Sequence, residues 1–385
     1  MTTVIFALGS NGSGQLGIGH KEDVSVPKMV LFHDDDSNDH DDLAPAKIVA
    51  GGNHTIIVTT SGSVYWAGDF TTGACGKVVA QRDVQQPEFY PVNLTASPQP
   101  FKVGPVAATW EGTIITRLDD EQNKNTQVYA FGSGNKGELG LGEFIVRTPN
   151  PSLIPNFPPP DTHIIDLSAC ASHVVAVLSN GEAWGWGVGR KGQLGQPAEA
   201  IIHSPRKIID DNINFKVIRA VCGREFTCLF GSPETGDFAI IGSDKRDIKS
   251  GAPPSQNVAG WKEVGASWGN VYVLKQDGTL LSWGRNDQGQ QLAPADLPRN
   301  IERIAVGSEH VVALNESGDV TAWGWGEHGN CGPATANAEK KGEGSGQRNV
   351  IASSRFIPPG AKIVTIGAGC ATSWVAIKMP PAQEQ

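Results

Sequence analysis

Residues 187–195 read GVGRKGQLG, and residues 9–17 and 132–140 keep the same spacing as GSNGSGQLG and GSGNKGELG. The shared frame is G-x-x-x-x-G-[QEN]-L-G. With two less regular copies it recurs along the whole chain, and its leading glycines are Gly9, Gly68, Gly132, Gly187, Gly242, Gly284 and Gly324. A frame repeated at intervals of a few tens of residues is typical of solenoids and propellers.

Short apolar runs surround each frame. Residues 48–58 (IVAGGNHTIIV) and 304–314 (IAVGSEHVVAL) each read as two strands joined by a turn of small residues. A polar turn and a third strand follow, as in VYWAG at 64–68. This alternation predicts repeated antiparallel hairpins. The glycines fit turns that need a positive φ, which glycine adopts at little cost.

The two ends of the chain complement each other. Residues 4–17 form the second half of a unit, and residues 361–378 form the first half. We therefore predict an all-β, seven-bladed β-propeller, a single domain over 1–385, closed by pairing the half-blade 1–19 with the half-blade 361–378. The alternative, an open solenoid, would leave both half-units unpaired.

Composition narrows the function classes. The chain has 385 residues, 47 of them Gly, and a net charge of −9. The charge argues against direct binding of nucleic acid. No apolar run approaches the ~18 residues of a membrane span, so no membrane contact is expected. The N-terminus lacks the pattern of a signal peptide, and the six Cys include no C-x-x-C pair, which favours reduced thiols.

Three segments fall outside the repeat. Residues 33–42 (HDDDSNDHDD) form an acidic loop; a calcium loop is excluded because Asp39 stands where Gly is needed and Pro45 where Glu is needed. We predict a mobile loop at 334–347 and a tail at 379–385.

The repeat motifs resemble those of the regulator-of-chromosome-condensation superfamily of seven-bladed propellers. Residues 307–333 and 369–376 also resemble the fungal killer-toxin-insensitivity subgroup, although this chain has extra loops. The resemblance implies a non-enzymatic scaffold, cytoplasmic and nuclear, that forms a heterodimer with a small CSL-type zinc (electron-carrier) protein. It would thereby support diphthamide biosynthesis and Elongator-dependent modification of the tRNA wobble uridine, its contacts with Elongator and the diphthamide enzymes being indirect.

The superfamily also suggests an alternative, a guanine-nucleotide exchange factor for a small GTPase. No basic run precedes the first strand at Val4, as a chromatin-bound exchange factor would be expected to carry. A ubiquitin-ligase-linked propeller would need an added catalytic domain, for which the tail leaves no room.

Residues that the repeat does not explain are the candidate binding residues. In the turn GWGEHGNCG (324–332), Cys331 fills the Leu position and is expected to be buried, whereas Trp325, Glu327 and His328 are additions. Tryptophans in turns are either interface residues or inter-blade contacts, and both alternatives stay open. The predicted partner-binding residues are Trp110, Glu111, Trp268, Glu309, Trp325, Glu327 and His328.

No catalytic, metal or cofactor site is predicted. A zinc site needs about four ligands, and none with suitable spacing surrounds His328. Phosphate-binding and hydrolase motifs are absent from the sequence. The repeat histidines His54, His173 and His310 share one position and are predicted to be structural; Trp268, Glu111, Glu225 and Cys370 are assigned to the same position in other units.

Overall fold

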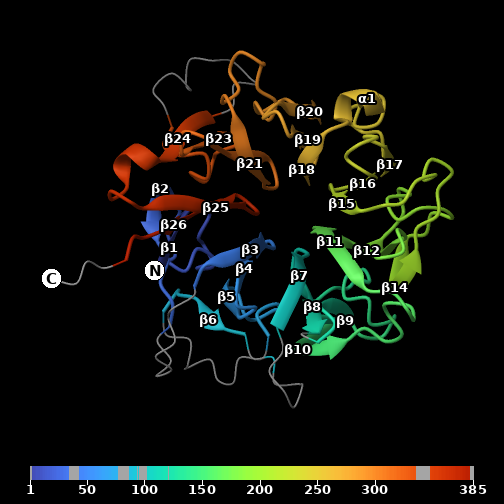
Figure 1. Cartoon of the computed structure of the whole chain (residues 1–385). Helices are drawn as coiled ribbons and strands as arrows, with labels where there is room; N and C mark the ends of the chain where they lie inside the picture. Colours follow the sequence, from blue (N-terminus) through green and yellow to red (C-terminus); the bar gives the residue numbers. More distant parts are fainter. Residues whose placement is uncertain are drawn as a thin grey trace.

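The computed structural model describes residues 2–33, 43–76, 86–92, 94, 102–119, 121–334 and 347–381. Its strands pair antiparallel and form six sheets around a central axis (Figure 1). The strands nearest the axis contact one another in a closed ring; they are β3, β7, β11, β15, β18, β21 and β25. The structure does not describe residues 34–42, 335–346 and 382–385. Most of the predicted acidic loop (33–42), mobile loop (334–347) and tail (379–385) therefore lies outside the described residues.

Two four-stranded sheets lie at the start of the chain, and the first also contains its end. The first comprises β1 (Thr3–Gly9), β2 (Val24–Met29), β25 (Lys362–Ala368) and β26 (Thr372–Lys378). The second comprises β3 (Pro45–Ala50), β4 (His54–Thr59), β5 (Val64–Gly68) and β6 (Tyr90–Pro91).

The central part of the chain forms one eight-stranded sheet. Its strands are β7 (Lys102–Ala108), β8 (Gly112–Asp119), β9 (Lys124–Ser133), β10 (Arg147–Leu153), β11 (Ile164–Cys170), β12 (His173–Leu178), β13 (Ala183–Val188) and β14 (Ile201–Lys207).

Three smaller sheets complete the ring. Two are three-stranded: β15 (Arg219–Cys222), β16 (Phe226–Phe230) and β17 (Phe238–Gly242), then β18 (Trp261–Ala266), β19 (Asn270–Lys275) and β20 (Leu280–Gly284). The last has β21 (Ile301–Val306), β22 (His310–Asn315), β23 (Asp319–Gly324) and β24 (Gln347–Ser353). Helix α1 (Ser255–Val258) follows β17, and a 3-10 helix (Ser354–Phe356) follows β24.

The predicted count of seven blades is wrong, because the described strands form six sheets of three, four or eight strands. The eight-stranded sheet arises because the long strand β9 reaches β11, where Asn125 pairs with Ile164. The Asn125 side chain strengthens this junction by donating to the Ile164 carbonyl over 3.2 Å. After β17 and β20 the chain forms α1 and a loop in place of a fourth strand.

The two ends of the chain pair with each other. Strand β1 lies antiparallel to β26, from Thr3 opposite Lys378 to Gly9 opposite Thr372. Figure 1 shows β1 and β26 side by side. Each half-unit thus obtains the strand neighbour that it lacks in sequence, and neither exposes a long unpaired edge.

The glycine frame has a steric cause. All seven leading glycines have a positive φ, as the sequence predicted. At Gly132, with φ 112°, an added Cβ would lie 2.3 Å from the Glu111 carbonyl oxygen. The close approach of this turn to the backbone just before β8 therefore disfavours every residue with a side chain.

The Gln or Glu of the frame holds the turn together. Its buried side chain accepts a hydrogen bond from the backbone N–H two residues earlier, at 2.7 Å for Glu138 and 2.9 Å for Gln193. Gln15 and Gln290 do the same. The following Leu16, Leu139 and Leu194 are buried, and so is Cys331, which confirms that Cys331 takes the Leu position.

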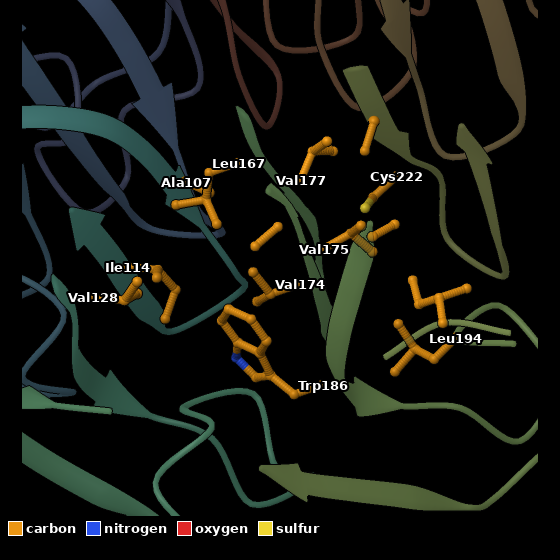
Figure 2. Packing of buried hydrophobic residues seen from close by; sticks show 14 of the residues in the cluster. Ala107, Ile114, Val128, Leu167, Val174, Val175, Val177, Trp186, Leu194 and Cys222 are labelled. Atoms are coloured by element: carbon orange, nitrogen blue, oxygen red, sulfur yellow. The ribbon is translucent and has the colours of Figure 1, made fainter. Parts of the chain in front are cut away.

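The core lies between neighbouring sheets. Figure 2 shows Ala107, Val128 and Leu167 on one side of Trp186, and Val175 and Cys222 on the other. The Trp186 indole N–H also donates to the Glu138 carbonyl, in the glycine turn of an earlier unit. Trp283 and Trp323 make the same kind of bond to Ile248 and Gln290. Apolar burial and these bonds fix the angles between sheets and hold the turns in place.

Candidate functional site

The repeat histidines form buried connections between sheets. The Nε2 atoms of His54 and His173 lie 3.1 Å from Thr113 Oγ1 and Thr227 Oγ1, and His310 Nε2 lies 3.0 Å from Ser373 Oγ. Each hydroxyl in turn donates to a carbonyl of a glycine turn, as Thr227 does to Gln193 O over 2.8 Å. The histidines are therefore structural.

The hydroxyl proton decides which nitrogen of the ring carries hydrogen. Because Thr227 uses its proton on Gln193 O, His173 Nε2 must be the donor in their bond. His173 Nδ1 and His310 Nδ1 are buried and have no hydrogen-bond partner among the described residues. A second proton would place an unpaired charge there, and burial lowers the pKa of His54, His173 and His310 to about 4.

The shared position assigned from sequence is wrong for four residues. Strand register aligns His310, opposite Gly324, with Asn270, opposite Gly284. Trp268 precedes Asn270 by two residues. By the same register, Glu111 and Glu225 stand one residue before the histidine position and Cys370 stands two before it. All four belong to the turn that precedes the buried connection and not to the connection itself.

These turns and the glycine turns enclose a hollow of about 1130 Å³ on one face of the ring. It lies over the turns that follow β7, β11, β15 and β18, and the glycine turns after β9, β13 and β17 form its outer side. Of the predicted binding residues it brings together Trp110, Glu111, Trp268 and Glu309.

Trp110, Arg224 and Trp268, here called the tryptophan group, form the most aromatic part of the hollow. The rings of Trp110 and Trp268 have centroids 6.1 Å apart, and the Arg224 guanidinium lies 5.2 Å from the Trp268 ring. Trp110 is 42% exposed.

Backbone bonds hold the tryptophan group rigidly. Trp110 N–H donates to the Ala171 carbonyl over 2.8 Å, and Trp268 N–H donates to the Ser308 carbonyl over 2.8 Å. Arg224 N–H donates to the Trp268 carbonyl over 3.0 Å. Because each turn is tied to the next turn around the ring, the partly exposed rings present a preformed surface.

Glu309 is buried at the edge of the hollow and bonds a neighbouring arginine. Its carboxylate accepts a hydrogen bond from Arg285, and from Gln290 Nε2 at 3.0 Å. Arg285 also bonds Asp287, and this hydrogen bond lowers the pKa of Asp287. Arg246 Nη1 lies 3.0 Å from Asp287. Glu309 therefore acts by positioning Arg285.

Trp325, Glu327 and His328 are not among the residues that line the hollow. Their turn, residues 325–330, is here called the Trp325 turn. His328 Nδ1 lies 2.8 Å from Asp23 Oδ2, and the His328 ring meets Trp325 edge-on with centroids 5.7 Å apart. Glu327 is exposed. This turn is tied to the sheet that closes the ring, away from the tryptophan group.

Sequence reasoning missed Arg224 in the hollow and Phe144 beside it. Arg224 occupies the turn position of Trp110 and Trp268, so strand register could have found it. Phe144 is 94% exposed beside Val146, which lines the hollow. A run of three apolar residues just before a strand was the available signal for Phe144.

Within the described residues, no group of three or more His, Cys, Asp or Glu side chains could hold a metal ion. Cys331 is buried, which raises the pKa of its thiol. None of the described helices has the length and hydrophobicity of a membrane span. The hollow therefore offers a contact surface and charged side chains.

The comparisons with known proteins agree with the repeat. The family model described as "RCC1-like domain" matches residues 4–375. The "RCC1 repeat-containing protein C10F6.04" of Schizosaccharomyces pombe is 29% identical over 97% of this chain and 99% of its own length. The mouse "Secretion-regulating guanine nucleotide exchange factor" is 24% identical over 98% of this chain and 84% of its length. The structure of Prp20p from Saccharomyces cerevisiae, 20% identical, superposes with a TM-score of 0.77 over 99% of this chain and 93% of that one.

Proposed function

Because this chain belongs to the family of RCC1-like domains, we propose that it is a non-enzymatic regulatory subunit that binds a small partner protein in the hollow. The single observation that supports this most strongly is the tryptophan group. Trp and Arg side chains dominate the energy of many protein interfaces, particularly where the surface is preformed. Here two tryptophans and an arginine are in contact, partly exposed and fixed by backbone bonds.

The chemistry of the hollow favours binding over catalysis. The described residues that line it include neither histidine nor cysteine. Glu138 has a pKa raised by burial, but its carboxylate is occupied by the backbone N–H of Lys136. A carboxylate used to hold a turn is a poor candidate for proton transfer to a substrate.

The partner that we propose is a small CSL-type zinc protein, forming a heterodimer with this chain in the cytoplasm and nucleus. This proposal rests on the resemblance of residues 307–333 and 369–376 to the killer-toxin-insensitivity subgroup. Through that partner the chain would support diphthamide biosynthesis and Elongator-dependent modification of the tRNA wobble uridine.

Calorimetric titration of this protein with the CSL-type zinc protein of the same organism tests the proposal. We expect one-to-one binding that Trp110→Ala weakens. Absence of binding at tens of micromolar would contradict the choice of partner and leave the fold unchanged. Loss of diphthamide from elongation factor two after deletion of the gene would connect binding to the proposed pathway.

A second candidate is guanine-nucleotide exchange, favoured by two of the similar proteins. The mouse relative that aligns over 98% of this chain is named as an exchange factor, and the Prp20p structure is described with its binding to Gsp1p and histones. Release of labelled GDP from purified small GTPases would test it. We expect this chain to leave the release rate unchanged; clear acceleration would favour the exchange factor.

A further inference from the structure

We propose that the hollow receives an acidic segment of its partner, with an apolar side chain of that segment on Phe144. This inference rests on the proposed function, because it concerns the chemistry of the partner at the same hollow. The charge of the hollow is opposite in sign to the net charge of the chain. The whole chain carries −9, yet among the described residues seven basic and four acidic side chains line the hollow.

Several of the basic side chains have no acidic partner. Arg246 and Arg285 are held by Asp287 and Glu309. Lys136, Arg190 and Lys245 are exposed and form no ion pair with the described residues. Arg224 faces the Trp268 ring.

Hydrogen bonds hold the backbone of the turns that carry these unpaired cations. Lys136 and Arg190 belong to glycine turns closed by the buried side chains of Glu138 and Gln193. Lys245 follows Ser243, whose backbone N–H donates to the Glu225 carbonyl over 2.9 Å. The backbone that carries these cations is already ordered, so binding a carboxylate restricts little beyond the side chains themselves, which favours specific contacts with acidic side chains.

An apolar segment borders the same hollow. Phe144 is 94% exposed, and Ile145 and Val146 are 44% and 49% exposed. Hydrogen bonds fix both sides of this segment, from Gly134 N–H to the Val146 carbonyl and from Gly142 N–H to the His203 carbonyl, each 2.9 Å. An exposed aromatic ring on an anchored segment marks an interaction surface.

The combination favours a polypeptide over a nucleic acid. Glu111 and Glu225 stand among the cations in the hollow and would repel a continuous phosphate backbone. The net charge of −9 also repels a polyanion at a distance. An acidic peptide can place neutral or basic residues opposite these carboxylates and an apolar residue on Phe144.

Fluorescence polarisation with three labelled probes tests the inference on the whole chain. The first is a peptide of alternating Asp and Glu around a central Leu-Phe pair, the second has Lys at every acidic position, and the third is an oligothymidine. We expect only the acidic peptide to bind, with an affinity that falls as salt rises. Equal binding of the lysine peptide, or tighter binding of the oligonucleotide, would overturn the inference.

Charge reversal locates the contact. Arg190→Glu and Lys245→Glu should each weaken the acidic peptide about tenfold, as expected for close charge pairs. Lys362→Glu is the matched control, because exposed Lys362 lies at the start of β25, at the opposite end from the turn. Phe144→Ser should weaken binding severalfold without changing the melting temperature. Equal effects of Lys362→Glu and Arg190→Glu would contradict the assignment.

The two proposals fail in different ways. If the acidic peptide binds and the CSL-type protein does not, the charge inference stands and the proposed partner is wrong. If the CSL-type protein binds with the same affinity to wild type and Arg190→Glu, the proposed function stands and the inference fails.

Discussion

The tryptophan group and the Trp325 turn lie on one face of the ring, yet their surroundings differ. In the tryptophan group the polar partner of Trp268 is the guanidinium of Arg224, and no described acid pairs with that cation. In the Trp325 turn, His328 already has a carboxylate partner in Asp23. The cation of the first region is free to pair with an acidic group of a partner, whereas the histidine of the second region already has a carboxylate partner within the chain. Similar residues in similar turns can therefore differ in what they offer to a binding partner.

The largest expected effect concerns the buried histidines, which support both regions. His173 lies below the hollow and His310 below the Trp325 turn. Their pKa is about 4 when folded, against 6.5 for an unperturbed histidine. The unfolded chain therefore binds more protons between these values, and stability falls as pH is lowered through that window. Each histidine contributes about 1.4 kcal/mol per pH unit.

Urea unfolding at a series of pH values would measure this slope. His310→Asn copies Asn270, the natural residue at this position in another sheet, and should reduce the slope by about 1.4 kcal/mol per pH unit. Above pH 6.5 its slope should equal that of the wild type. An unchanged slope below pH 6.5 would contradict the buried neutral state.

The next largest effect on stability is expected from the ion pairs, which should differ between the two regions. Arg285→Met leaves the buried Glu309 carboxylate without its cation and should cost about 3 kcal/mol of unfolding free energy. His328→Ala breaks an exposed pair with Asp23 and should cost less than about 1 kcal/mol. Urea unfolding of both variants checks this, and equal losses would remove the distinction.

The histidine connections themselves should respond alike in the two regions. Thr227→Val and Ser373→Ala each leave a histidine N–H and a carbonyl without a partner, and each should cost about 2 kcal/mol. Thr235→Val, at an exposed position, is the control. Thermal unfolding of all three variants checks the expectation. A loss no larger than that of the control would show that the connections add nothing.

The sequence predicted those features of the fold that depend on a few neighbouring residues. A positive φ at Gly9 or Gly132 is a property of one turn, so the frame revealed it. The pairing of β1 with β26 followed from two incomplete units. The count of sheets depends on how far β9 extends toward β11, through Asn125, and the repeat pattern does not contain that length.

The candidate site was predictable only in part, for a related reason. Trp110 and Trp268 stood out as tryptophans in turns. Their contact with Arg224 depends on which turns lie side by side in the ring. The histidine position was shifted by up to two residues because the turns of small residues carry little alignment signal, whereas strand register fixes them.

The most direct test of the central claim compares the two regions in one titration. Trp268→Ala and Trp325→Ala would each be titrated calorimetrically with the CSL-type zinc protein. We expect Trp268→Ala to weaken binding at least about tenfold, or about 1.4 kcal/mol, whereas Trp325→Ala stays within about twofold of wild type. A loss confined to Trp325→Ala would place the binding surface on the Trp325 turn and contradict binding in the hollow.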